Sequence, residues 1–212
     1  MSGARVYLLR VAVVSLLALY SLQAAVVQAG PVQIPQTGQQ ICWNAEGGEI
    51  PCSGSGQDGD LPKGEVWPAS RFMDNGQTIT DTLTGLMWTK DANAPGPAGC
   101  GTGPKNWQGA LDHLQCLNAN AYLGYNDWRL PNVRELRSLI HYGHPSPSAW
   151  LKQPEQGFTN VQAAYYWSSS SFLSSGSTIT AAWAWAVGVW SGGVEVQPKS
   201  DSLYIWPVRA GQ

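Results

Sequence analysis

Glu135 is the carboxyl group of this chain that most invites a catalytic interpretation, because it follows the run Trp-Arg-Leu-Pro-Asn at 128–132. A two-carboxylate glycosidase aims both groups into one cleft, and the spacing of Asp127 and Glu135 does not show such an arrangement. Asn132 can instead cap a helix, and Glu135, three residues later, can accept a hydrogen bond from the N–H of that cap. We therefore assign Asn132 and Glu135 to a helix cap and name no catalytic residue.

The four cysteines, Cys42, Cys52, Cys100 and Cys116, could form disulfides or bind a metal. An even number of cysteines favours disulfides in an exported chain, and residues 1–29 have the features of an export signal. Zinc is disfavoured because the cysteines form no Cys-x-x-Cys pair and have no close His partner. The sequence allows three pairings, and we predict the two local ones, Cys42–Cys52 and Cys100–Cys116.

Other polar clusters give weaker signals. His141 and His144 are three residues apart, but Gly143 is expected to end a helix between them, so we predict no metal site there. Residues 54–60 lack the ligand spacing of an EF-hand, and we expect a solvated turn, with calcium binding left open. The serines at 168–171 lack the Gly-x-Ser-x-Gly elbow of a serine hydrolase. We predict no metal and no cofactor.

The 11 Trp residues are the remaining binding signal. Aromatic rings stack on sugar rings and are favoured at binding surfaces. We predict ligand contacts for Trp150 in a long loop, for Trp190 at a hairpin tip and, less clearly, for Phe172. Core positions are expected for the tryptophans within regular elements: Trp88, Trp107, Trp128, Trp167, Trp183 and Trp185.

The helix that would hold Glu135 is predicted from Val133 to about Tyr142. Pro131 disfavours an earlier start, because the residue before a proline is restricted to extended backbone. Leu136, Leu139 and Ile140 share one face of this helix, which should be buried. An earlier helix is expected after an Asn106 cap, with Cys116 at its end.

Strands are predicted on both sides of these helices. Before them come a hairpin at 71–80 around Asn75-Gly76 and a strand at 86–89. After them come a long loop at 144–164 and four strands, at 165–169, 181–189, 194–197 and 203–208. In the strand at 181–189, Trp183, Trp185, Val187 and Val189 share the face expected to meet the core, and the alternate small residues permit close approach on the other. This order indicates an α+β fold.

The chain carries the marks of export. Residues 1–29 combine Arg5 and Arg10 with an apolar run and small residues at 27–29, typical of a signal peptide; a cut after Ala25 is also permitted. Removing the two arginines leaves 10 basic and 14 acidic residues, a net charge of −4. That balance gives no general attraction for nucleic acid or anionic membrane. We expect an irregular, disulfide-containing lead-in at 30–68 and a single domain at 69–212.

Several motifs in this order resemble one known family. They are Arg71-Phe72-x-Asp74-Asn75-Gly76, Asp81-x-Leu83-Thr84-Gly85-Leu86-Met87-Trp88, Trp128-Arg129-Leu130-Pro131-Asn132-x-x-Glu135-Leu136, Tyr166-Trp167-Ser168-Ser169 and Pro207-Val208-Arg209. They are similar to the C-terminal domain of the Legionella collagen-like adhesin, over about 67–209. The resemblance implies a C-type-lectin-like fold with two helices, a small antiparallel sheet and long loops. Adhesion to sulfated polysaccharide is attributed to the whole adhesin.

The run at 128–135 also resembles a run of the formylglycine-generating and sulfatase-modifying enzymes, which share that fold. Their activity needs a reactive cysteine pair late in the domain, and no cysteine follows Cys116 here. We therefore do not transfer the enzymatic role.

Together these observations predict an exported bacterial binding module, without enzymatic activity, for surface attachment or recognition. The expected partner is a glycan or a surface protein, with no membrane span after signal removal. The main alternative is a structural subunit of an extracellular or envelope assembly, and an enzyme is a third. We expect a secreted, periplasmic or cell-surface location and leave the oligomeric state open.

Overall fold

The structure is a computed structural model that describes residues 34–173 and 182–211. The predicted signal peptide and the start of the predicted strand at 181–189 lie outside these residues. Within them the chain is α+β, as predicted, with three α-helices and three small antiparallel sheets. No helix in the described ranges is both long and apolar enough to cross a membrane.

A four-stranded sheet combines three strands from the start of the domain, including the predicted hairpin, with one strand from its end. It contains β3 (Phe72–Asp74), β4 (Thr78–Asp81), β5 (Leu86–Thr89) and β9 (Val208–Ala210), in the order β3-β4-β5-β9. Gly76 adopts φ 91° in the turn between β3 and β4, a conformation that glycine reaches without steric cost. The last strand shares only Val208 with the predicted strand at 203–208, so that prediction is displaced toward the N-terminus. It pairs with β5 in an antiparallel register.

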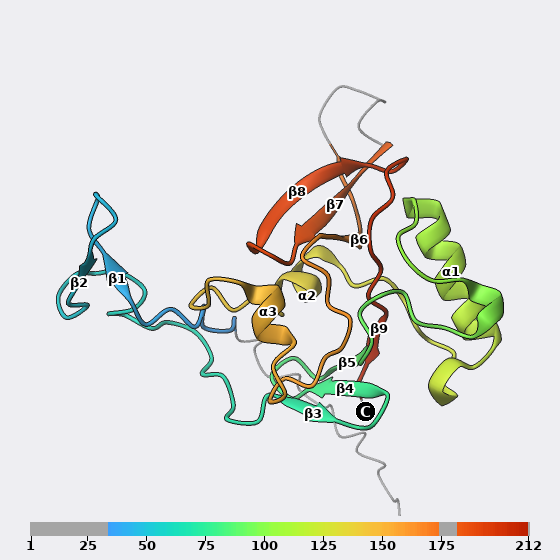
Figure 1. Cartoon of the computed structure of the whole chain (residues 1–212), viewed down its shortest axis with the longest axis horizontal. Coiled ribbons are helices and arrows are strands. Elements are labelled where there is room, and N and C mark those ends of the chain that lie inside the picture. The colour runs from blue at the N-terminus through green and yellow to red at the C-terminus, as the bar shows by residue number, and fades with distance from the viewer. Residues whose placement is uncertain (1–33, 174–181, 212) are drawn as a thin grey trace, which may run out of the picture. The chain divides into compact units, whose positions relative to one another are not determined.

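A three-stranded sheet, ordered β6-β7-β8, contains β6 (Tyr165–Ser171), β7 (Trp183–Gly188) and β8 (Gly193–Pro198). Figure 1 shows the two larger sheets at opposite ends of the body, residues 69–211, with α2 and α3 between them. The predicted core face of the strand at 181–189 is wrong for Trp183 and Trp185 but is confirmed for Val187 and Val189, which are buried. Ala184 and Ala186 on the opposite face are fully buried, and both indoles are half-buried. Only small side chains fit on this face of β7, because large rings such as that of Trp167 already fill the core beside it.

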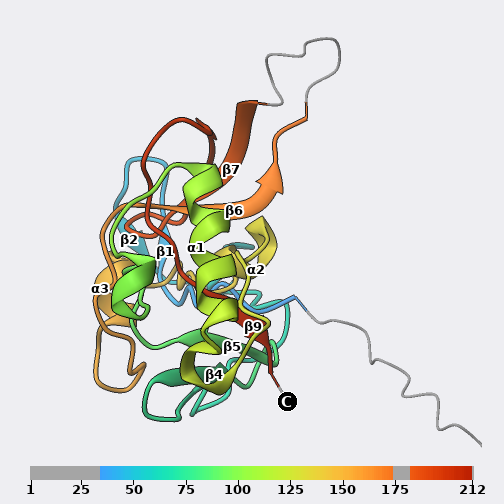
Figure 2. The ribbon, with the colours of Figure 1, turned by 90° about the vertical axis from the view of Figure 1, so that its right-hand side faces the viewer.

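The first helix, α1 (Trp107–Ala119), begins where the sequence predicts. The side chain of Asn106 accepts a hydrogen bond from the N–H of Gly109, which caps the helix. The Cys100–Cys116 disulfide joins this helix to the short 3₁₀ turn η1 (Ala98–Cys100) that precedes it. A second 3₁₀ turn, η2 (Tyr122–Gly124), follows the helix. Figure 2 shows α1 extending from the level of β6 and β7 to that of β5 and β9.

The second helix, α2 (Val133–Arg137), is shorter than predicted. The Ser138 hydroxyl donates to the Glu135 carbonyl, which competes with continuation of the helix. The N–H of Tyr142 donates to the Thr37 carbonyl instead of a helical partner. Leu139 and Ile140 are nevertheless buried as predicted, because tight turns keep them against the same core.

The predicted loop at 144–164 contains a helix that the sequence analysis did not predict, α3 (Pro147–Leu151). Ser146 caps this helix, accepting a bond from the N–H of Ala149, and Pro147 stands at its start. Serine followed by proline is a helix-start signal, because the proline needs no hydrogen-bond acceptor there.

Two apolar clusters form the core of the body. One includes Trp88, Leu136 and Trp206 and lies among α2, α3 and both larger sheets. The other includes Trp128 and Trp167 and lies against α1. The predicted core positions of Trp88, Trp128 and Trp167 are therefore confirmed. Trp107 is half-buried and packs against the second cluster.

The lead-in contains the two-stranded sheet of β1 (Cys42–Trp43) and β2 (Glu49–Ile50). The predicted Cys42–Cys52 disulfide is present and closes this hairpin. Pro35 and Glu65 form an isolated parallel bridge that brings the two ends of the lead-in together. Most of the lead-in is irregular, as expected from its Gly-rich and Pro-rich sequence.

Candidate binding surface

Charged residues of the family motifs form ion pairs with one another instead of lining an open cleft. Arg71 and Asp81 form a two-point ion pair with bonds of 2.8 and 2.7 Å, and both side chains are buried. Asp81 also accepts bonds from the N–H of Leu83 and the hydroxyl of Thr84, so it shapes the turn before β5. Arg71 additionally donates to the Ser138 carbonyl at 2.8 Å, which joins β3 to the end of α2.

Glu135 completes the helix cap that the sequence predicts. Asn132 accepts bonds from the N–H groups of Arg134 and Glu135, and Glu135 accepts one from the N–H of Asn132 at 2.7 Å. Arg129 adds a two-point ion pair with Glu135, both bonds being 2.7 Å, which the sequence analysis missed. Burial by itself would raise the pKa of Glu135, but the bonds from Arg129 and Asn132 outweigh it and lower the pKa. Glu135 is thus held as a carboxylate by structural partners.

Asp127 is held by Arg209, near the end of the chain. The Nε of Arg209 donates to Asp127 at 2.6 Å, and its guanidinium lies 4.0 Å from the centre of the Tyr125 ring. The hydrogen bond from Arg209 lowers the pKa of Asp127. Asp127 and Glu135 therefore serve two separate ion pairs, and neither is set up as a general acid.

The histidines do not form a metal site in the described parts of the chain. Residues 34–173 and 182–211 contain no group of three or more His, Cys, Asp or Glu side chains suited to a metal ion. His113 is buried beside the carbonyls of Cys100 and Pro95, and this burial lowers its pKa. His141 packs against Trp67 and Trp150, and burial lowers its pKa as well.

The structure does not bring the three predicted ligand-contacting aromatics together. Trp150 lies on α3 rather than in a loop and is half-buried. Its ring centre is 5.3 Å from that of Trp67 and 4.8 Å from that of His141. Phe172 packs edge-on against Trp185, with ring centres 5.4 Å apart.

Trp190 is the most open of the three, with 37% of its surface exposed. It follows β7, and its ring lies over Gly188, where an added Cβ would come within 2.8 Å of the indole. Tyr165 of β6 packs edge-on against Trp190 with ring centres 4.6 Å apart. A glycine at position 188 therefore leaves room for the indole of Trp190 to pack against the strand.

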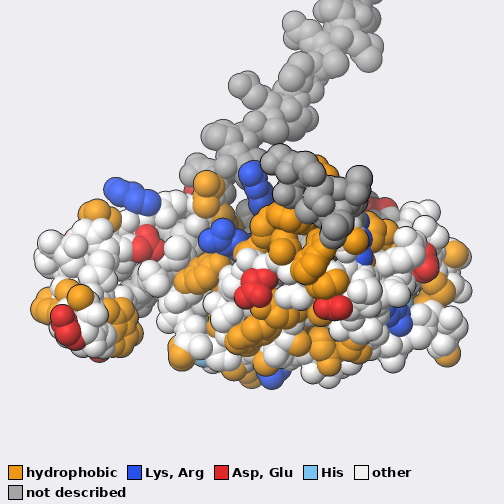
Figure 3. All heavy atoms as spheres, turned by 90° about the horizontal axis from the view of Figure 1, so that it is seen from above, with side chains coloured by type: hydrophobic (Ala, Val, Ile, Leu, Met, Phe, Trp, Pro, Cys, Tyr) orange, Lys and Arg blue, Asp and Glu red, His pale blue; other side chains and the backbone are white. Residues whose placement is uncertain are grey.

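Glu195 of β8 adds a polar group to this pair of rings. A hydrogen bond with Glu195 raises the pKa of Tyr165 to about 12. Figure 3, which views the molecule from above β7 and β8, shows hydrophobic side chains gathered there with isolated acidic groups among them. Tyr165, Trp190 and Glu195, here called the Trp190 patch, combine aromatic rings with a hydrogen-bonding carboxylate. The sequence analysis missed Tyr165 and Glu195, because only strand register shows that they meet.

The family comparison agrees with the motifs. The model of the Lcl C-terminal domain matches residues 77–209. The chain belongs to the Lcl C-terminal domain family. No curated protein matches the sequence. Membership of the family and the two disulfides indicate an extracellular protein.

Proposed function

We propose that this Lcl C-terminal domain protein is a non-enzymatic, C-type-lectin-like module that recognises glycans in surface attachment, through the Trp190 patch. The observation that carries the proposal is the exposed indole of Trp190, packed on Tyr165 beside Glu195. Apolar ring faces suit the C–H faces of sugars, and a carboxylate can accept bonds from sugar hydroxyls. The structural ion pairs of Asp127 and Glu135 support a binding role over catalysis.

A glycan array with the mature protein, followed by titration of any hit, tests this function. Trp190→Ala is expected to weaken binding roughly tenfold, equivalent to about 1.4 kcal/mol. Met73→Ala is a matched control, since Met73 is 52% exposed on β3 of the other sheet. Equal binding by both variants would show that the Trp190 patch is not the contact surface.

Salt dependence distinguishes stacking from ionic recognition. Arg134 and Arg137 are exposed on α2 and take part in none of the ion pairs of the described residues. With the Trp190 patch as the contact, affinity should change only weakly with salt, because no cation contributes. A steep salt dependence that disappears in Arg134→Ala/Arg137→Ala would place the contact on α2 and favour a sulfated polymer.

Exposed apolar side chains in the lead-in favour a second candidate, a structural subunit of an extracellular assembly. Ile34, Val66 and Leu61 are 80%, 66% and 48% exposed. Such side chains outside the core mark protein contacts when they gather in a patch. A stable oligomer in size-exclusion chromatography with light scattering, together with an empty glycan array, would favour this candidate over glycan recognition.

A further inference from the structure

A groove of about 300 Å³ lies between the lead-in and the turn that follows α2. Its walls include Gln39, Gln40, Ile41 and Trp43 on one side and Tyr142 and His144 on the other. This volume is at the lower end of the range for small-molecule sites, about 300–1,000 Å³. The groove is distinct from the Trp190 patch, and the lead-in wall precedes the part of the chain matched by the family model.

Specific contacts hold the two walls together. The N–H of Tyr142 donates to the Thr37 carbonyl at 2.8 Å, next to the start of the lead-in wall. The Tyr142 hydroxyl donates to the Gly192 carbonyl at 3.1 Å, which fixes the ring on its other side. The indole N–H of Trp67 donates to the Gln36 carbonyl at 2.7 Å, so the far end of the lead-in is also held. The groove therefore exists before any ligand arrives.

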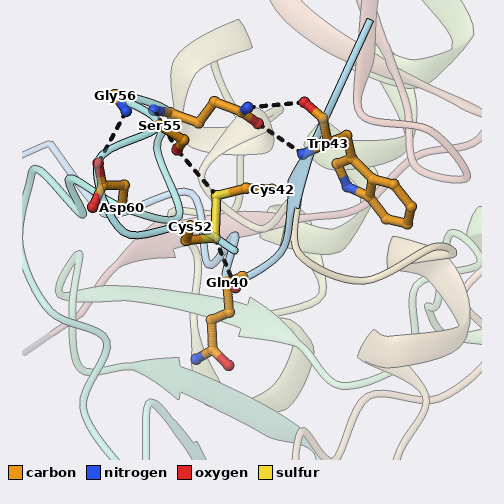
Figure 4. Close-up of a disulfide and its surroundings, with 8 residues drawn as sticks. Gln40, Cys42, Trp43, Cys52, Ser55, Gly56 and Asp60 are labelled. Carbon is orange, nitrogen blue, oxygen red and sulfur yellow. Dashed lines mark hydrogen bonds between the residues drawn. A yellow bond between two sulfur atoms is a disulfide. The ribbon is translucent and has the colours of Figure 1, made fainter. Parts of the chain in front are cut away.

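Trp43 stands on a rigid base and has a free ring. The preceding residue, Cys42, is bonded to Cys52. The side chain of Gln57 accepts a bond from the N–H of Trp43 at 3.0 Å and donates one to its carbonyl at 2.9 Å. Figure 4 shows the indole pointing away from the disulfide. Half of the Trp43 surface is exposed, although the backbone beneath it is fixed. An aromatic ring held in this way loses little entropy when a ligand covers it.

The groove walls have a chemistry suited to a neutral sugar. Among the described residues, the groove lining contains no Lys, Arg, Asp or Glu side chain. Arg137 donates to the Tyr142 hydroxyl at 3.0 Å but is not part of the lining. The amides of Gln39 and Gln40 can donate and accept hydrogen bonds, as sugar hydroxyls do, and the imidazole of His144 adds a further polar group. Sulfated or phosphorylated ligands need cations, which the walls lack. The indole of Trp43 supplies an apolar face for the sugar ring.

We propose that this groove is a second binding site, for a neutral sugar residue, with Trp43 against the ring face and Gln39, Gln40 and His144 bonding its hydroxyls. This inference rests on the proposed glycan recognition and adds to it a ligand class and a contribution from the lead-in. The Cys42–Cys52 disulfide then serves recognition, because it sets the position of Trp43.

Titration of the mature protein with methyl β-D-galactopyranoside and methyl β-D-glucopyranoside, followed by ¹H–¹⁵N NMR, tests the site. The indole N–H signal of Trp43, assigned from its loss in Trp43→Phe, is expected to shift at millimolar sugar. Trp43→Ala should weaken the binding at least tenfold, and Trp43→Phe should retain part of it. Leu61→Ala is the matched control, because Leu61 is similarly exposed in the lead-in but lies outside the groove walls.

Two further variants separate the outcomes. Cys42→Ser/Cys52→Ser should weaken the sugar-induced shift while leaving the signals of the body in place. Trp190→Ala removes the proposed glycan contact in the other patch, so loss of array binding in that variant with an intact Trp43 response supports two sites. An unchanged Trp43 signal with both sugars, or a response only to a sulfated sugar, overturns the neutral-sugar site without deciding the function of the Trp190 patch.

Discussion

The body depends mainly on a buried core, to which one disulfide adds, whereas the lead-in depends on a disulfide with little core. The body buries large rings in two clusters and pairs Arg71 with Asp81 out of contact with water. The lead-in has one two-stranded sheet, one disulfide and several exposed apolar side chains. A segment that is tied down covalently does not need to bury its apolar groups for stability. The lead-in can therefore present Trp43 to a partner, while the tryptophans of the body serve mainly in packing.

Breaking the buried ion pair should have the largest effect. Arg71→Ala leaves Asp81 charged and buried, which we expect to cost about 3–5 kcal/mol of unfolding free energy. Urea unfolding measures the loss. Lys90→Ala is the control, because it removes a partly exposed pair with Asp74 in the same sheet and should have a much smaller effect. Similar losses in both variants would contradict the importance assigned to burial.

The two disulfides offer the most direct test of the comparison. Replacing Cys100 and Cys116 by serine opens a loop with a sequence separation of 16 and should cost about 3 kcal/mol. The same change at Cys42 and Cys52 should hardly alter unfolding of the body but should speed proteolysis within the lead-in. Equal losses of thermal stability would mean that the lead-in is part of the cooperative fold of the body.

Trp150 joins the two regions, since it packs on Trp67 of the lead-in and on Phe72 of the body. Trp150→Ala should cost roughly 2 kcal/mol, less than a fully buried tryptophan. Thermal melting measures this loss, which would not be expected of a ligand-contacting residue in a loop, as the sequence predicted for Trp150. Trp190→Ala, at the more exposed position, should cost less in the same melting experiment. The opposite order would restore Trp150 as a surface residue.

The smallest effect concerns the cap of α2. Glu135→Gln retains an acceptor for the N–H of Asn132 but loses the ion pair with Arg129, and we expect a cost of about 1 kcal/mol at neutral pH. The folded-state pKa of Glu135 is lowered, so its contribution is present above the unfolded pKa, about 4.3, and disappears as pH falls through the folded value. The difference between wild type and variant in urea unfolding should therefore shrink with acidification. A difference independent of pH would point to packing instead.

Local sequence signals predicted many of the elements. The Asn-Gly turn, the Asn106 and Asn132 caps and both disulfides could be predicted because each depends on residues close in the chain. The length of α2 was not predicted, because the local bond from the Ser138 hydroxyl acts together with the Thr37 carbonyl, which is distant in sequence and binds the N–H of Tyr142. The buried face of the early part of β7 was wrongly predicted, since alternation gives two faces but does not say which one meets a filled core.

The sequence by itself determined the α+β class and the family. Those properties depend on local periodicity, turn chemistry and ordered motifs. Only the tertiary structure decided which aromatics are accessible: Trp150 meets Trp67, Trp190 lies over Gly188, and Trp43 remains open. It also paired Arg209 with Asp127 and Arg129 with Glu135, which leaves those carboxylates structural. Exposure and charge pairing depend on contacts between distant segments, and a linear pattern does not contain them.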